Sequence, residues 1–185
     1  MSQKKLSDKK VLLLVENLYD EMELNYPLHR LKEEGTEVVI AGPKAKEIYK
    51  SKYGMPCEAE IAFKDVKEHE YDALVIPGGY APDKLRRDPK VLELVQKFNQ
   101  KEKPIAFICH AGWVPISARV IKDVRCTSTT AIKDDLINAG AQWVDEPVVI
   151  DRHFISSRTP ADLPEFCRGI IQLLTHKHPR KTAMV

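Results

Sequence analysis

The sequence has few cysteines, and none of them are paired at a metal-binding spacing. The four cysteines, at positions 57, 109, 126 and 167, include no C-x-x-C pair. Such a set fits neither a small disulfide-stapled protein nor a zinc knuckle. We therefore expect reduced thiols, no bound metal and a cytoplasmic location.

The chain also lacks a long hydrophobic run and an excess of one charge. Its longest apolar runs have the length of a strand, and the run at 11–15 is broken by Glu16 and Asn17, so we expect neither a membrane span nor a targeting segment. The 29 basic residues nearly cancel the 27 acidic ones, which leaves a net charge of +2. This balance predicts neither nucleic acid nor an anionic membrane as a partner.

The remaining composition is that of an ordinary globular protein. The 185 residues are 43% hydrophobic and 30% charged, which excludes disorder as the main state. This length suits one domain, since domains commonly run to about 100–200 residues. We expect a core over about residues 10–174, with flexible tails at 1–9 and 176–185.

Short apolar blocks alternate with segments of helical periodicity, a pattern typical of an α/β fold with a mostly parallel sheet covered on both faces. Pro27 falls inside the first expected helix and should kink it. Residues 42–60 are polar and lysine-rich, and we expect a loop there with at most one hairpin. The expected strands are 11–15, 38–41, 71–76, 104–108, 124–128, 148–150 and 154–156, and the expected helices are 20–34, 88–98, 132–139 and 159–174, with a short helix after residue 109.

Three segments follow directly on expected parallel strands, at 16–21, 77–83 and 109–113. In open α/β sheets, ligands bind outside the carboxyl ends of the strands. We therefore expect all three segments on one rim of the sheet.

Cys109 has the sequence context of a nucleophile elbow. It ends a strand and is followed by His110 and then by Ala111 and Gly112, small residues that permit a sharp turn into a helix. A thiol facing the positive end of that helix should have a pKa below its usual value. The alternative is a cysteine that only fills the core.

The other candidate residues each have a structural alternative. The His110 amide could stabilise an oxyanion and its imidazole could pair with a carboxylate, or the residue could simply cap the helix. Gly78 and Gly79 would let backbone amides approach a ligand, or form a plain turn. Asp20 lies at the tip of the first loop and could be a catalytic acid, or a charge at a helix start.

Six blocks of sequence, in register from about residue 10 to 174, resemble the PfpI intracellular protease branch of the ThiJ/PfpI superfamily, which includes the Parkinsonism-associated protein deglycase. The blocks are V-L-L-L at 11–14, Y-P-L-H-R-L-K-E-E-G at 26–35, Y-D-A-L-V-I-P-G-G at 71–79, I-C-H at 108–110, I-K-D-D-L-I-N-A-G at 132–140 and S-S-R-T-P-A-D-L at 156–163.

The resemblance implies a flavodoxin-like three-layer sandwich of the class I glutamine-amidotransferase-like kind. It implies a reactive Cys109 beside His110, a carboxylate from the first loop at Asp20, and another from a neighbouring subunit at Asp83, in a homo-oligomer such as a dimer or hexamer. Both carboxylate positions are usually glutamate in the family. Tyr80 replaces the usual arginine after Gly-Gly.

Two kinds of function follow from these residues. The first is a cofactor-independent enzyme for stress protection, in which Cys109 attacks a carbonyl while Gly78, Gly79 and the turn at His110 and Ala111 bind substrate and oxyanion. The resemblance implies that its substrate is a small aldehyde such as methylglyoxal, in a glyoxalase or deglycase reaction, or a peptide. The second is a non-enzymatic redox sensor or chaperone in which Cys109 is oxidised.

Overall fold

A seven-stranded sheet organises the chain in a computed structural model that describes residues 5–175. In order across the sheet, the strands are β10 (Val148–Asp151), β11 (Phe154–Ser157), β7 (Ile105–Ile108), β6 (Ala73–Ile76), β1 (Lys10–Leu14), β2 (Glu37–Gly42) and β5 (Ile61–Ala62). Every neighbouring pair is parallel except β10 with β11. The predicted α/β class with a mostly parallel sheet is confirmed.

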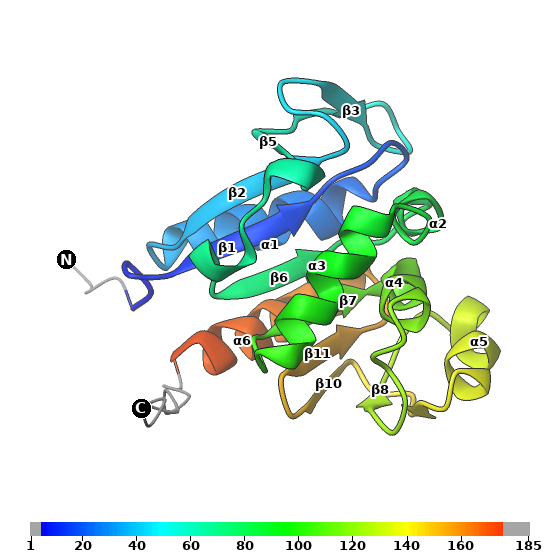
Figure 1. Cartoon of the computed structure of the whole chain (residues 1–185). Coiled ribbons are helices and arrows are strands. Elements are labelled where there is room, and N and C mark those ends of the chain that lie inside the picture. Colours follow the sequence, from blue (N-terminus) through cyan, green and yellow to red (C-terminus); the bar gives the residue numbers. More distant parts are fainter. Residues whose placement is uncertain (1–4, 176–185) are drawn as a thin grey trace, which may run out of the picture.

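Helices cover both faces of this sheet. Helices α1 (Glu21–Glu33) and α6 (Leu163–Thr175) pack against each other on one face, and α3 (Pro89–Gln100) crosses the other face in front of β6 and β7 (Figure 1). Because both faces are covered, β6 and β7 are buried at every position. This explains why these strands appear in the sequence as uninterrupted apolar runs.

Capping residues determine where two of these helices begin. The Asp20 carboxylate accepts the N–H groups of Met22 and Glu23 at the start of α1, and Asp88 accepts the N–H of Lys90 at the start of α3. Each cap satisfies backbone donors that the first turn of a helix leaves unpaired. Helix α1 continues through Pro27 for its full length.

The loops after β1, β6 and β7 meet at the carboxyl ends of the strands. The N–H of Tyr80 donates to Leu18 O at 2.8 Å, and the N–H of Asp20 donates to Gly78 O at 3.2 Å, so the first two loops lie side by side. The third continues through η3 (Cys109–Gly112) into α4 (Trp113–Ser117). The arrows of β1 and β6 point to this rim in Figure 1.

A hairpin lies over the first of these loops. Strands β3 (Ile48–Lys50) and β4 (Pro56–Glu58) pair antiparallel within the expected loop at 42–60. Its backbone is bonded to the loop after β1, since Leu18 N–H donates to Lys50 O at 2.7 Å and Lys52 N–H donates to Tyr19 O at 3.0 Å. The hairpin therefore brings Lys52 to the same rim.

Several short elements differ from the sequence expectations. The strand expected at 124–128 has two residues, β8 (Arg125–Cys126), which pair with β9 (Gln142–Trp143) outside the main sheet. Helix α2 (Ala81–Leu85) and strand β5 were not expected, because elements this short have too few residues to show a periodicity. The further elements are α5 (Lys133–Asn138) and the 3-10 turns η1 (Phe63–Asp65), η2 (Glu68–Glu70), η4 (Thr130–Ile132) and η5 (Pro160–Asp162).

The part of the expected N-terminal tail that is described packs on the domain. Leu6 is fully buried, and its N–H donates to Glu34 O at 3.0 Å. Leu6 is thus anchored on the domain, and the flexible tail predicted at 1–9 stays a prediction for the other residues. The tail expected at 176–185 lies outside the described residues.

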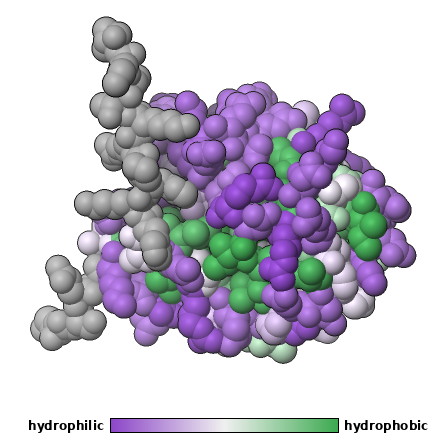
Figure 2. Space-filling view, turned by 90° about the horizontal axis from the view of Figure 1, so that it is seen from below, coloured by the Kyte–Doolittle hydropathy of each residue, from purple (hydrophilic) through white to green (hydrophobic). Residues whose placement is uncertain are grey.

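The surface is mostly hydrophilic on the side that carries β10 and β8, with a hydrophobic patch in its middle (Figure 2). None of the helices within residues 5–175 combines the length and the apolar character needed to cross a membrane.

Candidate functional site

Cys109 has the backbone conformation of a nucleophile elbow. It follows the last residue of β7 and has φ of +62°, a left-handed conformation that a non-glycine residue adopts at a cost. Strain of this kind persists where the surrounding structure imposes it, as at the nucleophile of a strand-turn-helix motif. The expected elbow geometry is confirmed.

Two glycines bring the loop after β6 against this cysteine. A Cβ at Gly78 would lie 2.8 Å from Cys109 Cβ and 2.5 Å from Glu23 Oε2, so only glycine fits between them. Gly79 has φ of +75°, and a Cβ there would lie 2.6 Å from the backbone nitrogen of Asp20. Both positions therefore require glycine because neighbouring atoms approach the backbone closely, which a plain turn would not require.

The carboxyl group beside the thiol belongs to Glu23. Its Oε2 accepts the N–H of Gly78 at 2.8 Å, and the side chain is completely buried. Its other oxygen, Oε1, is buried and forms no hydrogen bond of ordinary geometry with the residues described. The structure thus corrects the expectation for Asp20, whose side chain caps α1 instead of approaching Cys109.

The sequence did not single out Glu23, because a glutamate at this position is also typical of the capping of a helix start. It stands three residues after the N-cap Asp20, where a glutamate commonly reaches back to the cap. The available signal was its spacing, since Glu23, Pro27 and Leu31 lie four residues apart on the buried face of α1. A carboxylate on that face must point at the sheet.

Burial changes the protonation of both groups at the elbow. It raises the pKa of Glu23 from 4.5 to about 8, to which the negative charge of Asp20 adds, while the N–H of Gly78 and contact with Cys109 oppose the rise. Burial and the Glu23 charge raise the pKa of the Cys109 thiol to about 12. The lowered thiol pKa expected from sequence is therefore wrong, because burial outweighs the helix start.

Backbone donors at the sulfur act in the opposite direction. The N–H groups of His110 and Gly79 hydrogen-bond the Cys109 sulfur and lower its pKa. These are the two amides that the sequence suggested for oxyanion binding. They are positioned to stabilise negative charge that develops on or beside the sulfur.

His110 contacts the thiol directly. Its Nδ1 lies 3.3 Å from Cys109 Sγ, although the two residues are adjacent in sequence, because the elbow turns sharply between them. Burial lowers the pKa of His110, and the positive charge of Lys52 lowers it further. The imidazole is therefore neutral near pH 7 and can accept a proton.

Asp20 holds a lysine at the site. Its Oδ2 lies 2.7 Å from Lys52 Nζ, and the two side chains are 7% and 30% exposed. The hydrogen bond to Asp20 raises the pKa of Lys52, which keeps it charged. That charge lowers the pKa of both Glu23 and His110, so the hairpin contributes to the electrostatics of the elbow.

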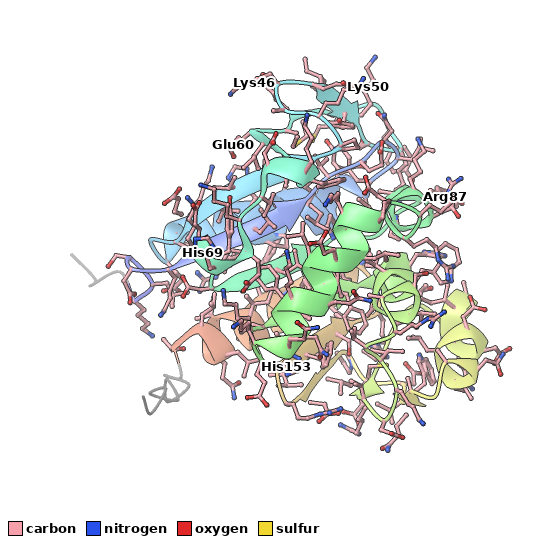
Figure 3. All side chains as sticks on the ribbon, viewed as in Figure 1. Lys46, Lys50, Glu60, His69, Arg87 and His153 are labelled. Carbon is pink, nitrogen blue, oxygen red and sulfur yellow. The ribbon has the colours of Figure 1, made fainter. Side chains whose placement is uncertain are left out.

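The remaining predicted residues lie farther from the thiol or have a structural place. Asp83 is on α2 and pairs with Arg87 at 2.8 Å, and Figure 3 shows Arg87 at the outer side of that helix. The predicted role of Asp83 in a neighbouring subunit stays a prediction. Ala111 is completely buried in the turn after the cysteine, and its part in substrate binding stays a prediction as well.

Two further histidines lie away from this site. His153 Nε2 lies 2.9 Å from Asn99 Oδ1 beside the start of β11, and His69 is in η2; Figure 3 places both away from α2. Within residues 5–175, no group of three or more His, Cys, Asp or Glu side chains is arranged to hold a metal ion.

Substituting Gly78 by alanine is expected to destabilise the fold by about 1–3 kcal/mol, since the new methyl group overlaps Glu23 and Cys109. Urea denaturation measures the loss. Gly54→Ala is the control, because no atom lies within 4 Å of a Cβ there and only the φ of +91° is strained. Equal losses in the two variants would contradict the close packing described.

Comparison with known proteins finds relatives along nearly the whole chain. The DJ-1/PfpI family matches residues 9–173. "Deglycase PfpI" of Pyrococcus furiosus is 44% identical over 165 residues, which cover 89% of this chain and 99% of the relative. "Putative cysteine protease YraA" of Bacillus subtilis is 36% identical over 166 residues, covering 90% and 98%.

Solved structures give the same match. A two-domain protein of Anabaena variabilis, with DJ-1/ThiJ/PfpI-like and ferritin-like domains, has a TM-score of 0.88 at 36% identity, covering 95% of this chain and 52% of that one. DJ-1beta of Drosophila melanogaster has a TM-score of 0.85 at 26% identity, covering 91% of each. The flavodoxin-like, class I glutamine-amidotransferase-like fold is thereby confirmed.

Proposed function

Because the chain belongs to the DJ-1/PfpI family, we propose that it is a cysteine-dependent enzyme that converts small α-oxoaldehydes such as methylglyoxal into 2-hydroxy acids without a cofactor. One observation carries the proposal: the buried Glu23 carboxyl stands next to the Cys109 thiol with one oxygen unpartnered among the described residues. A carboxyl so placed can both activate the thiol and move a proton on the bound substrate.

The proposed reaction begins with attack of sulfur on the aldehyde carbon. The S–C bond forms, and the thiol proton passes to Glu23 and from Glu23 to the aldehyde oxygen, which gives a hemithioacetal and leaves the carboxylate free to act as a base. Glu23 removes the C–H proton of that carbon and delivers it to the adjacent carbonyl carbon, while the proton of the hemithioacetal hydroxyl passes to the former ketone oxygen, which leaves the thioester of a 2-hydroxy acid. Water hydrolyses the thioester, releasing lactate from methylglyoxal and restoring the thiol.

The surrounding groups support these steps electrostatically. The N–H groups of Gly79 and His110 would stabilise the oxyanion formed when sulfur adds to the carbonyl. Gly78 holds the carboxyl of Glu23 by one oxygen, so the other oxygen stays available. The relative of Pyrococcus furiosus named a deglycase supports a carbonyl substrate.

A peptidase reaction is the second candidate. It is favoured by the 3.3 Å contact between His110 Nδ1 and Cys109 Sγ, because a neutral imidazole at that distance can accept the thiol proton for acyl transfer. The name of the Bacillus subtilis relative, a putative cysteine protease, supports the same chemistry. The non-enzymatic redox sensor, in which the Cys109 thiolate would attack peroxide, is the alternative to both enzyme functions.

The direct test is to incubate the purified protein with methylglyoxal and measure D- and L-lactate, alongside a panel of peptide substrates and mild peroxide. Lactate formation that depends on Cys109 supports the proposal. Peptide cleavage without lactate supports the peptidase. Selective oxidation of Cys109 with neither activity supports the sensor and contradicts both enzyme functions.

Lys52→Met is expected to shift the pH dependence of lactate formation to higher pH. Without the ammonium, the carboxyl of Glu23 ionises less readily, and the unpaired charge of Asp20 adds to the effect. At pH 7 we expect kcat/KM to fall about 3-fold or more. Lys50→Met is the matched control, because Lys50 is exposed on β3 and points outward in Figure 3. The same profile in both variants would contradict this role for Lys52.

We also propose that the enzyme acts as a homo-oligomer in which Asp83 approaches a neighbouring subunit's site. Activity per subunit is then expected to fall on dilution, together with the oligomer mass measured by light scattering. Full activity in a proven monomer would contradict the shared site.

A further inference from the structure

A stack of planar side chains runs from α2 through the elbow to the rim. The guanidinium of Arg86 lies 5.5 Å from the centroid of the Trp113 ring, and the Trp113 ring centroid lies 5.2 Å from that of His110. The His110 centroid in turn lies 6.2 Å from that of Tyr80, with the two rings tilted by 32°. His110 therefore lies next to two aromatic rings, and its own ring is tilted by 58° from that of Trp113.

This stack is tied to the fold at its inner end. Trp113 Nε1 donates to Asp135 Oδ2 at 2.7 Å, and Arg86 Nε donates to Ser117 Oγ at 2.9 Å. Rings fixed in this way provide a preorganised wall, because little side-chain freedom remains to be lost when a ligand binds.

The outer end of the stack is open. Tyr80 is 61% exposed, while its backbone N–H donates to Leu18 O at 2.8 Å beside Gly79. The stack is also close to the reacting atom, since Nδ1 of His110 lies 3.3 Å from Cys109 Sγ. A substituent on a carbon bonded to that sulfur is therefore within reach of the His110 ring, which has the Tyr80 ring beside it.

We propose that Tyr80 is a specificity-determining residue and that its ring, with that of His110, selects α-oxoaldehydes that carry an aryl group. The inference rests on the proposed function, since it names a substrate class for the same thiol. Aromatic rings with centroids about 4.5–7 Å apart attract each other beyond the burial of their area. A methyl group in the same place has no such interaction.

The chemistry is that proposed for methylglyoxal. An aryl glyoxal adds the thiol at its aldehyde carbon, transfers the C–H proton through Glu23 to the adjacent carbon, and leaves as an aryl 2-hydroxy acid after water cleaves the thioester. One water is consumed, and neither oxidant nor reductant is required. With phenylglyoxal the product is mandelate.

The test is the ratio of kcat/KM for phenylglyoxal to kcat/KM for methylglyoxal, measured as mandelate and lactate. We expect Tyr80→Leu, which keeps an apolar side chain without a ring, to lower the ratio about 3- to 10-fold. Tyr80→Phe should keep it. Ile48→Ala is the control, because Ile48 is an exposed apolar side chain on β3 and stands outside the stack.

An unchanged ratio in Tyr80→Leu would overturn the assignment, as would a ratio that depends on protein concentration, since a second copy would then cover Tyr80. A binding measurement distinguishes failure of the proposed aryl selectivity from failure of the proposed function, because it does not require turnover. In Cys109→Ser protein, calorimetric titration should show tighter binding of mandelate than of lactate, with the preference reduced by Tyr80→Leu. Equal binding of the two acids would contradict the aryl site even if no turnover is seen.

Discussion

Cys109→Ser is expected to reduce lactate formation from methylglyoxal by more than about 10³-fold, because a hydroxyl at this position ionises far less readily than a thiol and forms no thioester. Serine differs from cysteine only by an oxygen in place of the sulfur. We therefore expect the backbone to keep its φ of +62° and the protein to fold. The measurement is kcat/KM from lactate release, with circular dichroism to confirm the fold.

Cys57→Ser is the matched control for the nucleophile. Cys57 is a free, half-buried cysteine on β4, and burial raises the pKa of its thiol to about 11. Its replacement should leave kcat/KM unchanged, because its sulfur lies against the carbonyl oxygen of Glu58 on the hairpin and is not the thiol at the elbow. Lactate formation that survives the loss of Cys109 would overturn the nucleophile assignment.

Glu23→Gln is expected to reduce kcat/KM by about 10²- to 10⁴-fold, the usual contribution of a positioned acid or base. Glutamine keeps the size of the side chain and an oxygen for the N–H of Gly78, but it cannot take a proton from the thiol or from carbon. Glu21→Gln, two residues earlier in the first turn of α1, is the control and should retain activity. Similar losses in both variants would indicate damage to the helix rather than loss of a catalytic group.

The same substitution should stabilise the protein at higher pH. The pKa of Glu23 is raised from 4.5 to about 8, so the folded chain keeps a proton that the unfolded chain releases. The contribution of Glu23 to the free energy of unfolding is fully present below pH 4.5. It is lost as the pH rises to 8, by up to about 1.4 kcal/mol per pH unit. Urea denaturation should therefore show that the free energy of unfolding of Glu23→Gln increases relative to that of the wild type between pH 5 and pH 8. A difference that is independent of pH would contradict the raised pKa.

The sequence was sufficient for the sheet and for the sharp turn at Cys109. Strands such as β6 and β7 are buried on both faces, so their apolar runs are continuous, and the residues after them must reach one rim. The sharp turn at Cys109 followed from the small residues after it. These inferences depend on local patterns, which a sequence records directly.

The carboxylate could not be chosen in the same way. Asp20 and Glu23 stand three residues apart at one helix start, and which of them turns inward depends on capping. Because the Asp20 carboxylate accepts the first N–H groups of α1, it is held at the helix start, and Glu23 is the residue that faces the sheet. The contribution of Lys52 was equally hidden, because it depends on hydrogen bonds between the hairpin and a loop some thirty residues earlier in the chain.

The pH dependence of kcat/KM for methylglyoxal tests the central claim most directly, namely that the ionised carboxyl of Glu23 activates the Cys109 thiol. Between pH 6 and pH 9, kcat/KM should rise through a single ionisation near the Glu23 pKa of about 8, because the carboxyl accepts the thiol proton only after it has lost its own. A rate that stays constant over this range, or falls above pH 8, would contradict it.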